Sequence, residues 1–366
     1  MLPSRQGRRR LRLAAALALA ACSHSEPFAT DVPDPLGPPH PALPRQLTYN
    51  LGDDRAPNVA GSQVAFSRRD PSNASPGECI ALLPAAGGTL TATLCPPPPT
   101  PADTFISSWL APALSPDAER LAFVWRRSAR VSALAAWSYD LVVASVDSPS
   151  VPLASQSLGR LLSGDRIVNT AVELAWRSPD VVRFLAAYDS VVKVKGGGAA
   201  RLTDTITVAR ALMDFDVATA TLTVVPGGDG VVAWSQAPDG RVWIVPDSDP
   251  YAVLTLAADG TRAPAGTWPV PVTDIAVIGG SVAGATALEW LYWMEPASGA
   301  GGRILLRGAA WRLSPAGADQ VVVEVERRGG DAFGAPANLW LVAIPRPGFS
   351  TSEAQRDRSD PKGRSS

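Results

Sequence analysis

The chain has 366 residues, of which 46% are hydrophobic and 18% are charged. This is enough apolar material for a folded core and excludes a wholly disordered protein. Its 35 prolines and 31 glycines suit many short strands joined by turns and argue against long helical bundles. Removing residues 1–21, with their five arginines, leaves 28 basic against 34 acidic residues, a net charge of −6 that argues against nonspecific nucleic-acid binding.

Residues 1–21 have the pattern of a signal peptide. Five arginines precede nine apolar residues, Leu13 to Ala21, a run too short to cross a hydrocarbon layer of about 30 Å. The run Leu19-Ala20-Ala21-Cys22 resembles the bacterial lipoprotein box, which implies cleavage before Cys22 and lipidation of its sulfur. Ser23 then implies the outer membrane. The alternatives are an ordinary secretory leader and, from the arginine run, twin-arginine export.

Two further segments flank the expected folded domain. Residues 22–45 are rich in proline and should form a lipidated, extended tether. Residues 346–366 are polar and charged and should be disordered. The domain then covers residues 46–345, in the cell envelope and facing the periplasm or the cell surface, with the lipid as its only attachment to the membrane.

Cys79 and Cys95 remain as a pair in an exported chain if Cys22 is lipidated. Cys79 begins the strand-like segment CIALLP, and Cys95 ends the strand-like segment TLTATLC. The two segments flank a glycine turn, and the midpoint between the cysteines is Gly87. Directly opposed residues of antiparallel strands lie about 4.5 to 5.5 Å apart, so we expect a disulfide. The alternative is two buried free thiols. Without nearby histidine, these cysteines do not predict a metal site.

A pattern of short β-rich segments recurs through residues 46–345. The clearest copy is APALSPDAERLAFVW with YDLVVASV, at 111–125 and 139–146. We expect five others: RAPNVAGSQVAFS with ECIALLP and TLTATLC; VELAWRSPDVVRFLAA with DSVVKVK and AARLTD; GVVAWSQ with RVWIVPD as the middle strands of a fourth copy; VTDIAVIGG with ALEWLYWME; and AAWRLSPAGADQVVVEVERR with NLWLVAIP. Six copies of about 50 residues suit four-stranded blades.

The copies resemble the TolB-like β-propeller family, in which a strand ends in Ser-Pro-Asp-Gly and the next reads like Leu-Ala-Phe. Ser115-Pro116-Asp117 and Leu121-Ala122-Phe123 match best. Ser314-Pro315 lacks the acid, and Ser178-Pro179-Asp180 is displaced by two residues. The resemblance implies a six-bladed β-propeller and a periplasmic interaction role. Because the chain departs from that family in its expected lipid anchor, its degenerate blade motifs and the lack of an evident separate N-terminal α/β domain, membership of a Tol complex does not follow. The alternative fold is a pair of β-sandwiches.

A closed ring leaves no exposed sheet at its ends, and one blade can be completed by a strand from the other terminus. Residues 46–49, Gln-Leu-Thr-Tyr, stand before the first copy and match Arg201 to Asp204, which should close the third. The sixth copy lacks such a segment after Ile344. We therefore expect residues 46–49 to form the outermost strand of the last blade.

Few residues of the domain suggest chemistry. His24 and His40, the only histidines, lie in the tether, so Ser-His-Asp hydrolysis is excluded, and we expect no metal and no cofactor. Asp214 and Asp216 share one face of an expected strand, as acids for glycoside chemistry would, although exposed acids are the commoner explanation. Asp247 to Asp249 fit a solvated turn better than a calcium site. Most of the eleven tryptophans should be core residues.

Paired arginines end the second strand of three copies, and a ring would bring these copies together. Guanidinium groups suit carboxylates and phosphates, which makes this a candidate binding site for an anionic partner. The alternative is that they pair with acids such as Asp70, Glu326 and Asp331, or stay solvated. The candidates are Arg68, Arg69, Arg126, Arg127, Arg327 and Arg328.

From these residues we expect a monomeric envelope lipoprotein that is not an enzyme and that binds an envelope protein or a cell-wall component. The alternative is a propeller enzyme active on glycosides, or a carbohydrate-binding protein, that uses carboxylates and tryptophans around the axis of the ring. Opposed acids at the axis would favour the alternative, whereas an arginine-rimmed face would favour binding.

Overall fold

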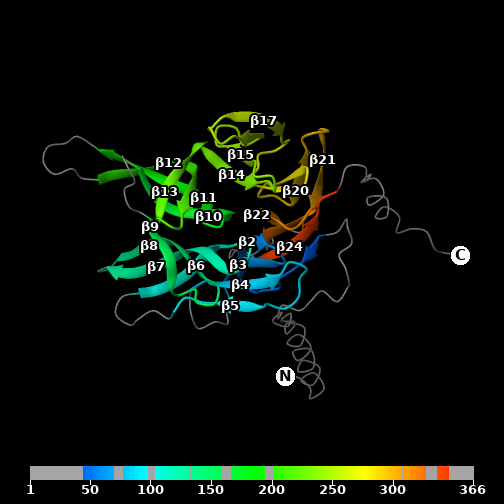
Figure 1. The fold of residues 1–366 in the computed structure, drawn as a ribbon. Helices are drawn as coiled ribbons and strands as arrows, with labels where there is room; N and C mark the ends of the chain where they lie inside the picture. Colours follow the sequence, from blue (N-terminus) through cyan, green and yellow to red (C-terminus); the bar gives the residue numbers. More distant parts are fainter. Residues whose placement is uncertain are drawn as a thin grey trace, which may run out of the picture.

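The computed structural model describes residues 44–69, 77–97, 104–131, 134–158, 166–193, 202–306, 308–326 and 336–345. These residues form 24 strands in six four-stranded antiparallel sheets and no helix, which confirms the six-bladed β-propeller (Figure 1). The described part therefore contains no helix that could span a membrane. The signal peptide, the tether with Cys22, the C-terminal tail, Arg327 and Arg328 lie outside it.

Each blade is a meander of four strands, counted here outward from the axis. The innermost strands are β2 (Asp53–Ala60), β6 (Thr104–Leu114), β10 (Arg166–Ser178), β14 (Val231–Gln236), β18 (Asp274–Ile278) and β22 (Ala309–Pro315). The second strands are β3 (Gln63–Arg69), β7 (Arg120–Val131), β11 (Val181–Lys193), β15 (Val242–Pro246), β19 (Ser281–Ala285) and β23 (Gln320–Glu326). The third strands are β4 (Cys79–Pro84), β8 (Leu134–Ser145), β12 (Leu202–Asp216), β16 (Ala252–Leu256), β20 (Trp290–Glu295) and β24 (Ala337–Ala343). The outermost strands are β5 (Ala92–Leu94), β9 (Pro152–Leu158), β13 (Thr221–Asp229), β17 (Arg262–Thr267), β21 (Ala300–Leu305) and β1 (Arg45–Gln46).

The chain's N-terminal strand completes the sixth blade, as predicted. β1 pairs with β24 through Arg45 opposite Leu341 and Gln46 opposite Trp340. The Leu47 amide then donates to the Leu339 carbonyl at 2.7 Å, and the Leu339 amide donates to the Thr48 hydroxyl at 3.0 Å. The strand starts one residue earlier than expected and ends sooner, because the Thr48 side chain replaces the backbone ladder there.

The recurring Ser-Pro-Asp motif has a local structural cause. In the turn after β6, the Ser115 hydroxyl accepts from the Arg120 amide at 2.9 Å, and Asp117 accepts from the Glu119 amide at 3.1 Å. Asp239 and Asp259 accept in the same way from the amides two residues on. An Asp side chain that bonds the backbone two residues later favours a turn, so the motif marks the bends between strands.

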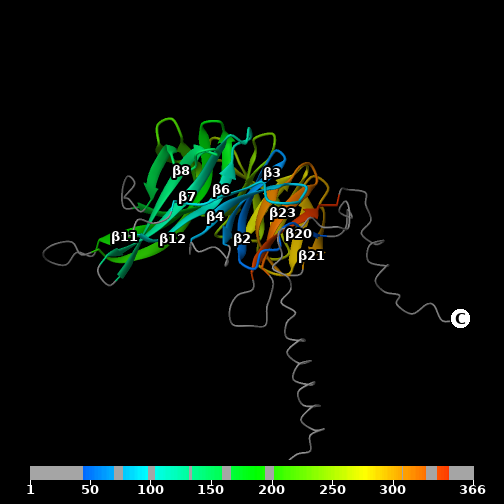
Figure 2. The ribbon, with the colours of Figure 1, turned by 90° about the horizontal axis from the view of Figure 1, so that it is seen from below.

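The predicted boundaries are wrong in the middle blades. DSVVKVK continues the strand that begins VVRFLAA, and Leu202 begins the third strand of that blade, so residues 201–204 do not close it. At 13 residues, β11 is much longer than the five-residue β15. The long strands of the second and third blades extend past the shorter strands of the other blades (Figures 1 and 2). GVVAWSQ and RVWIVPD are the first and second strands of the fourth blade, and the fifth contains an additional strand, β19.

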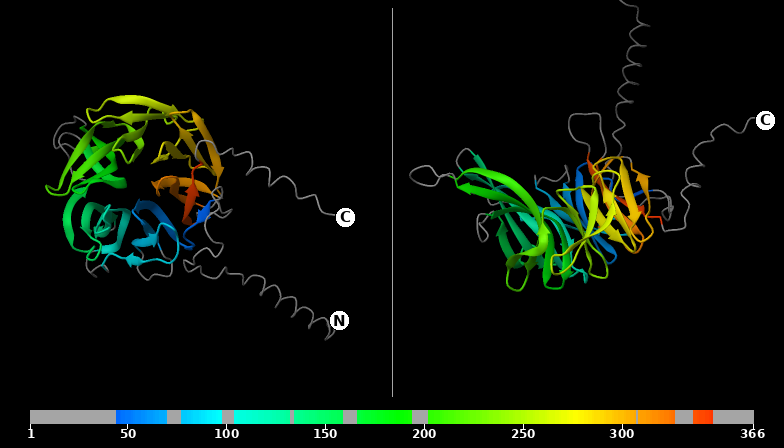
Figure 3. Two further views of the ribbon diagram at one scale, coloured as in Figure 1. Left: turned by 45° about the vertical axis from the view of Figure 1, so that its right-hand side comes forward. Right: turned by 90° about the horizontal axis from the view of Figure 1, so that it is seen from above.

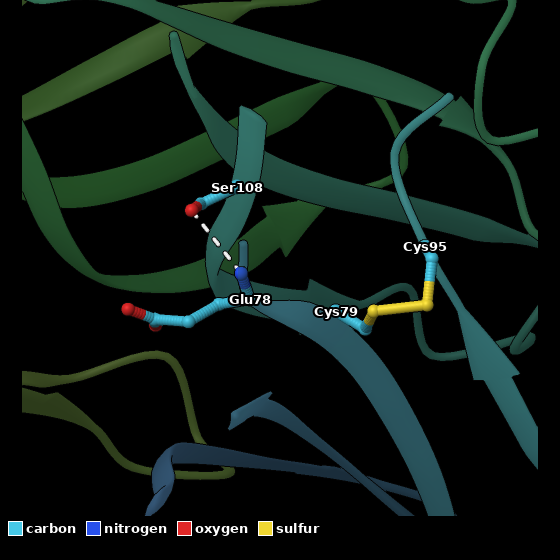
Figure 4. Close-up of a disulfide and its surroundings, with 4 residues drawn as sticks. All are labelled: Glu78, Cys79, Cys95 and Ser108. Atoms are coloured by element: carbon cyan, nitrogen blue, oxygen red, sulfur yellow. Dashed lines mark hydrogen bonds between the residues drawn. A yellow bond between two sulfur atoms is a disulfide. The ribbon is translucent and has the colours of Figure 1, made fainter. Parts of the chain in front are cut away.

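The predicted disulfide is present and joins Cys79, the first residue of β4, to Cys95, which directly follows the outermost strand β5 of the first blade. Ile80 lies opposite Leu94, which brings Cys79 opposite Cys95 with their Cα atoms 4.4 Å apart (Figure 4). Gly87 has a φ of 84° in the connecting turn, a conformation that glycine adopts readily. Next to the disulfide, the amide of Glu78 donates to the Ser108 hydroxyl at 3.1 Å and links the first blade to the second (Figure 4).

The six innermost strands surround a common axis (Figure 3). β2 contacts both β6 and β22, and β18 contacts both β14 and β22. Since every blade is an antiparallel meander, all innermost strands begin on the same face of the ring, where the second strands end. We call this face the upper face. Side chains near the starts of the innermost strands lie toward it.

Candidate active site at the axis

The innermost strands of five blades contain a β-bulge. The register with the second strand shifts at Arg55–Asn58, Leu110–Ala113, Val172–Ala175, Val231–Ala233 and Ala310–Leu313. Three of these bulges contain a non-glycine residue with positive φ, namely Ala56, Ala111 and Glu173. A bulge leaves backbone groups out of the ladder and redirects side chains. Here it makes both available for contacts between blades.

An ion pair connects opposite blades across the axis. Arg312, in the bulge of the sixth blade, donates to Oε1 of Glu173, in the bulge of the third. The two blades are separated by two others on either side, so only a closed ring can bring these residues together. The Glu173 side chain is 9% exposed and that of Arg312 is 27% exposed. The pair is therefore mostly removed from solvent.

Two further buried carboxyls lie beside this pair. Asp274, at the start of β18, accepts from the Leu313 amide at 2.7 Å and from the Ile275 amide at 2.8 Å. Glu324, on β23, accepts from the Ala56 amide at 2.9 Å and lies 3.9 Å from the Arg55 guanidinium. Each of them thus satisfies a bulge amide of a neighbouring strand. Together with Arg55 and Asp53, these residues make up what we call the axial cluster.

Burial makes the axial carboxyls hard to ionise. Loss of hydration raises the pKa of Glu173, Asp274 and Glu324, and the charge of Glu173 raises the pKa of Asp274 further. Arg312 acts in the opposite direction on all three. Arg210 acts in the same direction on Glu173, and Arg55 does so on Glu324. Burial is the largest effect on each of the three carboxyls, which favours a state in which at least one of them keeps its proton.

Glu173 combines three features that are costly in a folded protein. It has a φ of 54°, its carboxyl is buried, and its Oε2 has no hydrogen-bond partner among the described residues. Strained backbone and unsatisfied buried polar atoms concentrate at functional sites. The first two blades have alanine at the corresponding bulge position, so the fold itself does not require an acid there. Glu173 is therefore the candidate group for reaction with a ligand.

A change at Glu324 tests the electrostatics of the cluster. The pKa of Glu324 is higher in the folded than in the unfolded chain, so its stabilising effect is complete below the ordinary pKa of 4.5 and is lost as pH rises through the raised value. Glu324→Gln keeps an acceptor for the Ala56 amide but does not titrate. We expect the parent to lose stability relative to this variant as pH rises, in urea unfolding from about pH 4 to 8. The opposite trend would mean that Arg55 holds the carboxyl ionised.

The arginines predicted to bind an anionic partner are mostly paired in the described part of the chain. Arg68 is buried 3.6 Å from Asp54, Arg126 lies 3.3 Å from Glu78, and Arg127 pairs with Asp140. Arg69 is exposed. These acids differ from Asp70, Glu326 and Asp331, which the sequence suggested. They pair with guanidinium groups that the binding hypothesis assigns to an anionic partner. The anionic site stays a prediction.

The acids considered from the sequence serve local structure. Asp214 accepts two hydrogen bonds from the buried Arg183, at 2.7 and 2.9 Å, and Asp216 caps the turn at Thr219. Asp249 accepts from the Tyr251 amide in a turn. No group of three His, Cys, Asp or Glu side chains in the described ranges is arranged to hold a metal ion.

Sequence reasoning missed the axial cluster. Its signal is a charged residue within an apolar innermost strand: Glu173 in VELAW and Arg312 in AAWRL. A single charged residue in a strand is common, so neither residue alone indicates a site. Only closure of the ring brings the two side chains together.

No family model matches this chain, and no curated protein matches it. Solved structures with a similar fold include a luciferin-regenerating enzyme, 10% identical with a TM-score of 0.50, covering 84% of this chain and 98% of that one. A PQQ-bound aldose sugar dehydrogenase of Streptomyces coelicolor is 15% identical with a TM-score of 0.45, covering 84% and 99%. A gluconolactonase of Xanthomonas campestris is 15% identical with a TM-score of 0.44, covering 87% and 99%. Likeness at this level shows the fold alone.

These comparisons correct the expectation that the chain is not an enzyme. That expectation rested on the lack of histidine in residues 46–345 and on a binding role for the propeller. The luciferin-regenerating enzyme has the same fold, so a propeller of this kind gives no ground for excluding catalysis. The axial carboxyls also supply acid–base groups that do not depend on imidazole.

Proposed function

We propose that this protein is a sugar-active enzyme that hydrolyses a C–O bond of its substrate at the axial cluster. The observation that carries the proposal is Glu173, a buried carboxyl held at Oε1 by Arg312 with Oε2 unpaired. Carboxyls with a raised pKa are the usual acid–base groups in the cleavage of sugar linkages. The similar structures whose names include sugar substrates are consistent with it but do not establish it.

The residues divide the work as follows. In its protonated form, Glu173 donates a proton from Oε2 to the leaving oxygen as the C–O bond breaks. The resulting carboxylate accepts a proton from the water molecule whose oxygen bonds to the carbon, so one water is consumed and Glu173 is regenerated. Arg312 fixes the orientation of Glu173 and stabilises its charged form. Asp274, whose oxygens both accept backbone amides, one of them from Leu313 next to Arg312, is a positioning residue.

Hydrolysis of nitrophenyl glycosides and of sugar lactones tests this proposal. Glu173→Gln keeps an acceptor for Arg312 but cannot transfer the proton, so we expect a loss of about 100-fold or more in kcat. Glu119→Gln changes an exposed carboxyl in the turn between β6 and β7 and should retain full activity. Full activity of Glu173→Gln would contradict the proposal. Sugar binding without turnover of any substrate would make the protein a carbohydrate-binding protein instead.

We further propose that the chain is an envelope lipoprotein anchored at Cys22, on the outer membrane, and a member of the TolB-like family. The lipoprotein box and the Ser115-Pro116-Asp117 motif support this. Such an anchor would place the axial site near cell-wall glycans. Mature protein from native membranes should begin at Cys22 and carry a diacylglycerol mass, and Cys22→Ser should release it into the soluble fraction. An unmodified residue 22 in the membrane-bound protein would contradict the anchor.

A further inference from the structure

An exposed aromatic residue stands next to a member of the axial cluster in the chain. Trp311, in the bulge of β22 and adjacent to Arg312, is 38% exposed, although most large apolar side chains of the blades are buried. The loop before β20 runs alongside it: the Ala310 amide donates to the Leu288 carbonyl at 3.1 Å, and the Ala287 amide donates to the Ala310 carbonyl at 2.9 Å. Leu288 is itself 45% exposed. Both lie toward the upper face, where β22 begins.

The guanidiniums of the axial cluster are already engaged. Arg312 pairs with Glu173, and Arg55 pairs with Asp53 at 3.1 Å and lies near Glu324. Including Asp274, the cluster contains four carboxyls and two guanidiniums, and the charge of Arg210, which also acts on Glu173, adds a third guanidinium. An anionic ligand would have to break one of these pairs and approach a site without positive excess. The cluster therefore disfavours sugar acids and sugar phosphates.

A neutral sugar ring matches both features. Its hydroxyls can donate to and accept from the axial carboxyls, and its face of C–H groups can stack on an indole. A flat aromatic beside a polar cluster thus predicts a ring with one apolar face, and not an extended polyol or an ionised compound.

We infer that the axial site binds a neutral sugar ring that stacks on Trp311. This inference rests on the proposed function for the location of the site, but it concerns recognition and not turnover. Trp311 is then the residue that selects cyclic, uncharged substrates, and Glu173 is the residue that reacts with them.

Binding measurements separate recognition from catalysis. The probes are the neutral methyl glycosides of glucose, galactose, mannose and xylose, with glucuronate as the anionic partner of glucose, each titrated by calorimetry or ligand-observed NMR. We expect the parent to bind at least one neutral glycoside, Trp311→Ala to bind it about tenfold more weakly, and Trp311→Phe to stay within about threefold. Tyr251→Ala, which removes an exposed aromatic before a third strand, is the matched control and should bind like the parent.

The outcomes distinguish this inference from the proposed function. Sugar binding that depends on Trp311, without turnover of any substrate, would contradict the proposed enzymatic function and support the inference about recognition. Turnover that is unaffected by Trp311→Ala would support the enzyme and contradict the role of Trp311 in recognition. Failure of every neutral glycoside to bind, or tighter binding of glucuronate than of methyl glucoside, would overturn the inference. Circular dichroism of Trp311→Ala should match that of the parent, because the side chain is exposed.

Discussion

A chain that begins at Asn50 is expected to lose its cooperative fold, whereas one that begins at Pro44 keeps it. The shorter chain lacks β1, so β24 becomes an open edge and the sixth blade has three strands. It also loses Leu47 and Thr48, which are 3% and 0% exposed. Leu47 belongs to a hydrophobic cluster with Phe66 of the first blade and Leu341 of the sixth. The missing segment therefore joins the two blades at which the ring closes.

The size of this effect follows from its parts. Truncating a buried leucine to alanine costs about 2 to 5 kcal/mol, and whole domains are stable by only about 5 to 15 kcal/mol. We expect Leu47→Ala to shift the urea midpoint strongly downward and the chain starting at Asn50 to show no folded baseline. Unfolding followed by circular dichroism, together with size-exclusion chromatography, measures both. Equal midpoints for the chains starting at Pro44 and Asn50 would show that closure does not stabilise the ring.

Arg312→Met should destabilise the protein by about 3 to 5 kcal/mol, because it leaves Glu173 buried without its partner. The double variant Arg312→Met with Glu173→Gln removes both charges and should recover most of that loss. The single change should also cost less at low pH, where Glu173 can take up a proton, than at pH 8 or so. Urea unfolding of the two single variants and the double variant at both pH values gives the coupling energy.

Additive effects of the two changes would contradict a direct contact across the axis. Arg177→Met is a suitable control, since this exposed arginine also pairs with an acid, Asp214, which keeps the buried Arg183 as its partner. We expect that substitution to change stability by less than about 1 kcal/mol. A similar loss in both arginine variants would mean that removal of any ion pair has the same effect.

The ring could be predicted from the sequence because the patterns that encode its strands and turns are local and recur in successive blades. Turns such as Ser115 to Arg120 are encoded by side chains within six residues, and a strand left over at residues 46–49 matches a missing strand at the other end. Boundaries failed where this signal is absent: DSVVKVK was expected to be a separate strand, but Asp189 to Lys193 continue β11.

The candidate site could not be predicted in the same way. Glu173 and Arg312 are 139 residues apart, and their contact depends on bulges in two opposite blades and on closure of the ring between them. The paired arginines were more conspicuous in the sequence, but Arg68 and Arg126 have acids from the first blade beside them. Arg68 and Arg126, at strand ends, thus have structural partners, while single charges inside apolar strands, Glu173 and Arg312, meet at the axis.

The proton affinity of Glu173 tests the account most directly. In protein labelled with ¹³C at glutamate carboxyls, one resonance should disappear in Glu173→Gln, and in the parent that resonance should titrate clearly above 4.5, the ordinary pKa of glutamic acid. In Arg312→Met the same resonance should titrate higher still, since the guanidinium no longer stabilises the anion. A Glu173 carboxyl that titrates at or below its ordinary pKa, or that is indifferent to Arg312, would contradict a buried proton-transfer group at the axis.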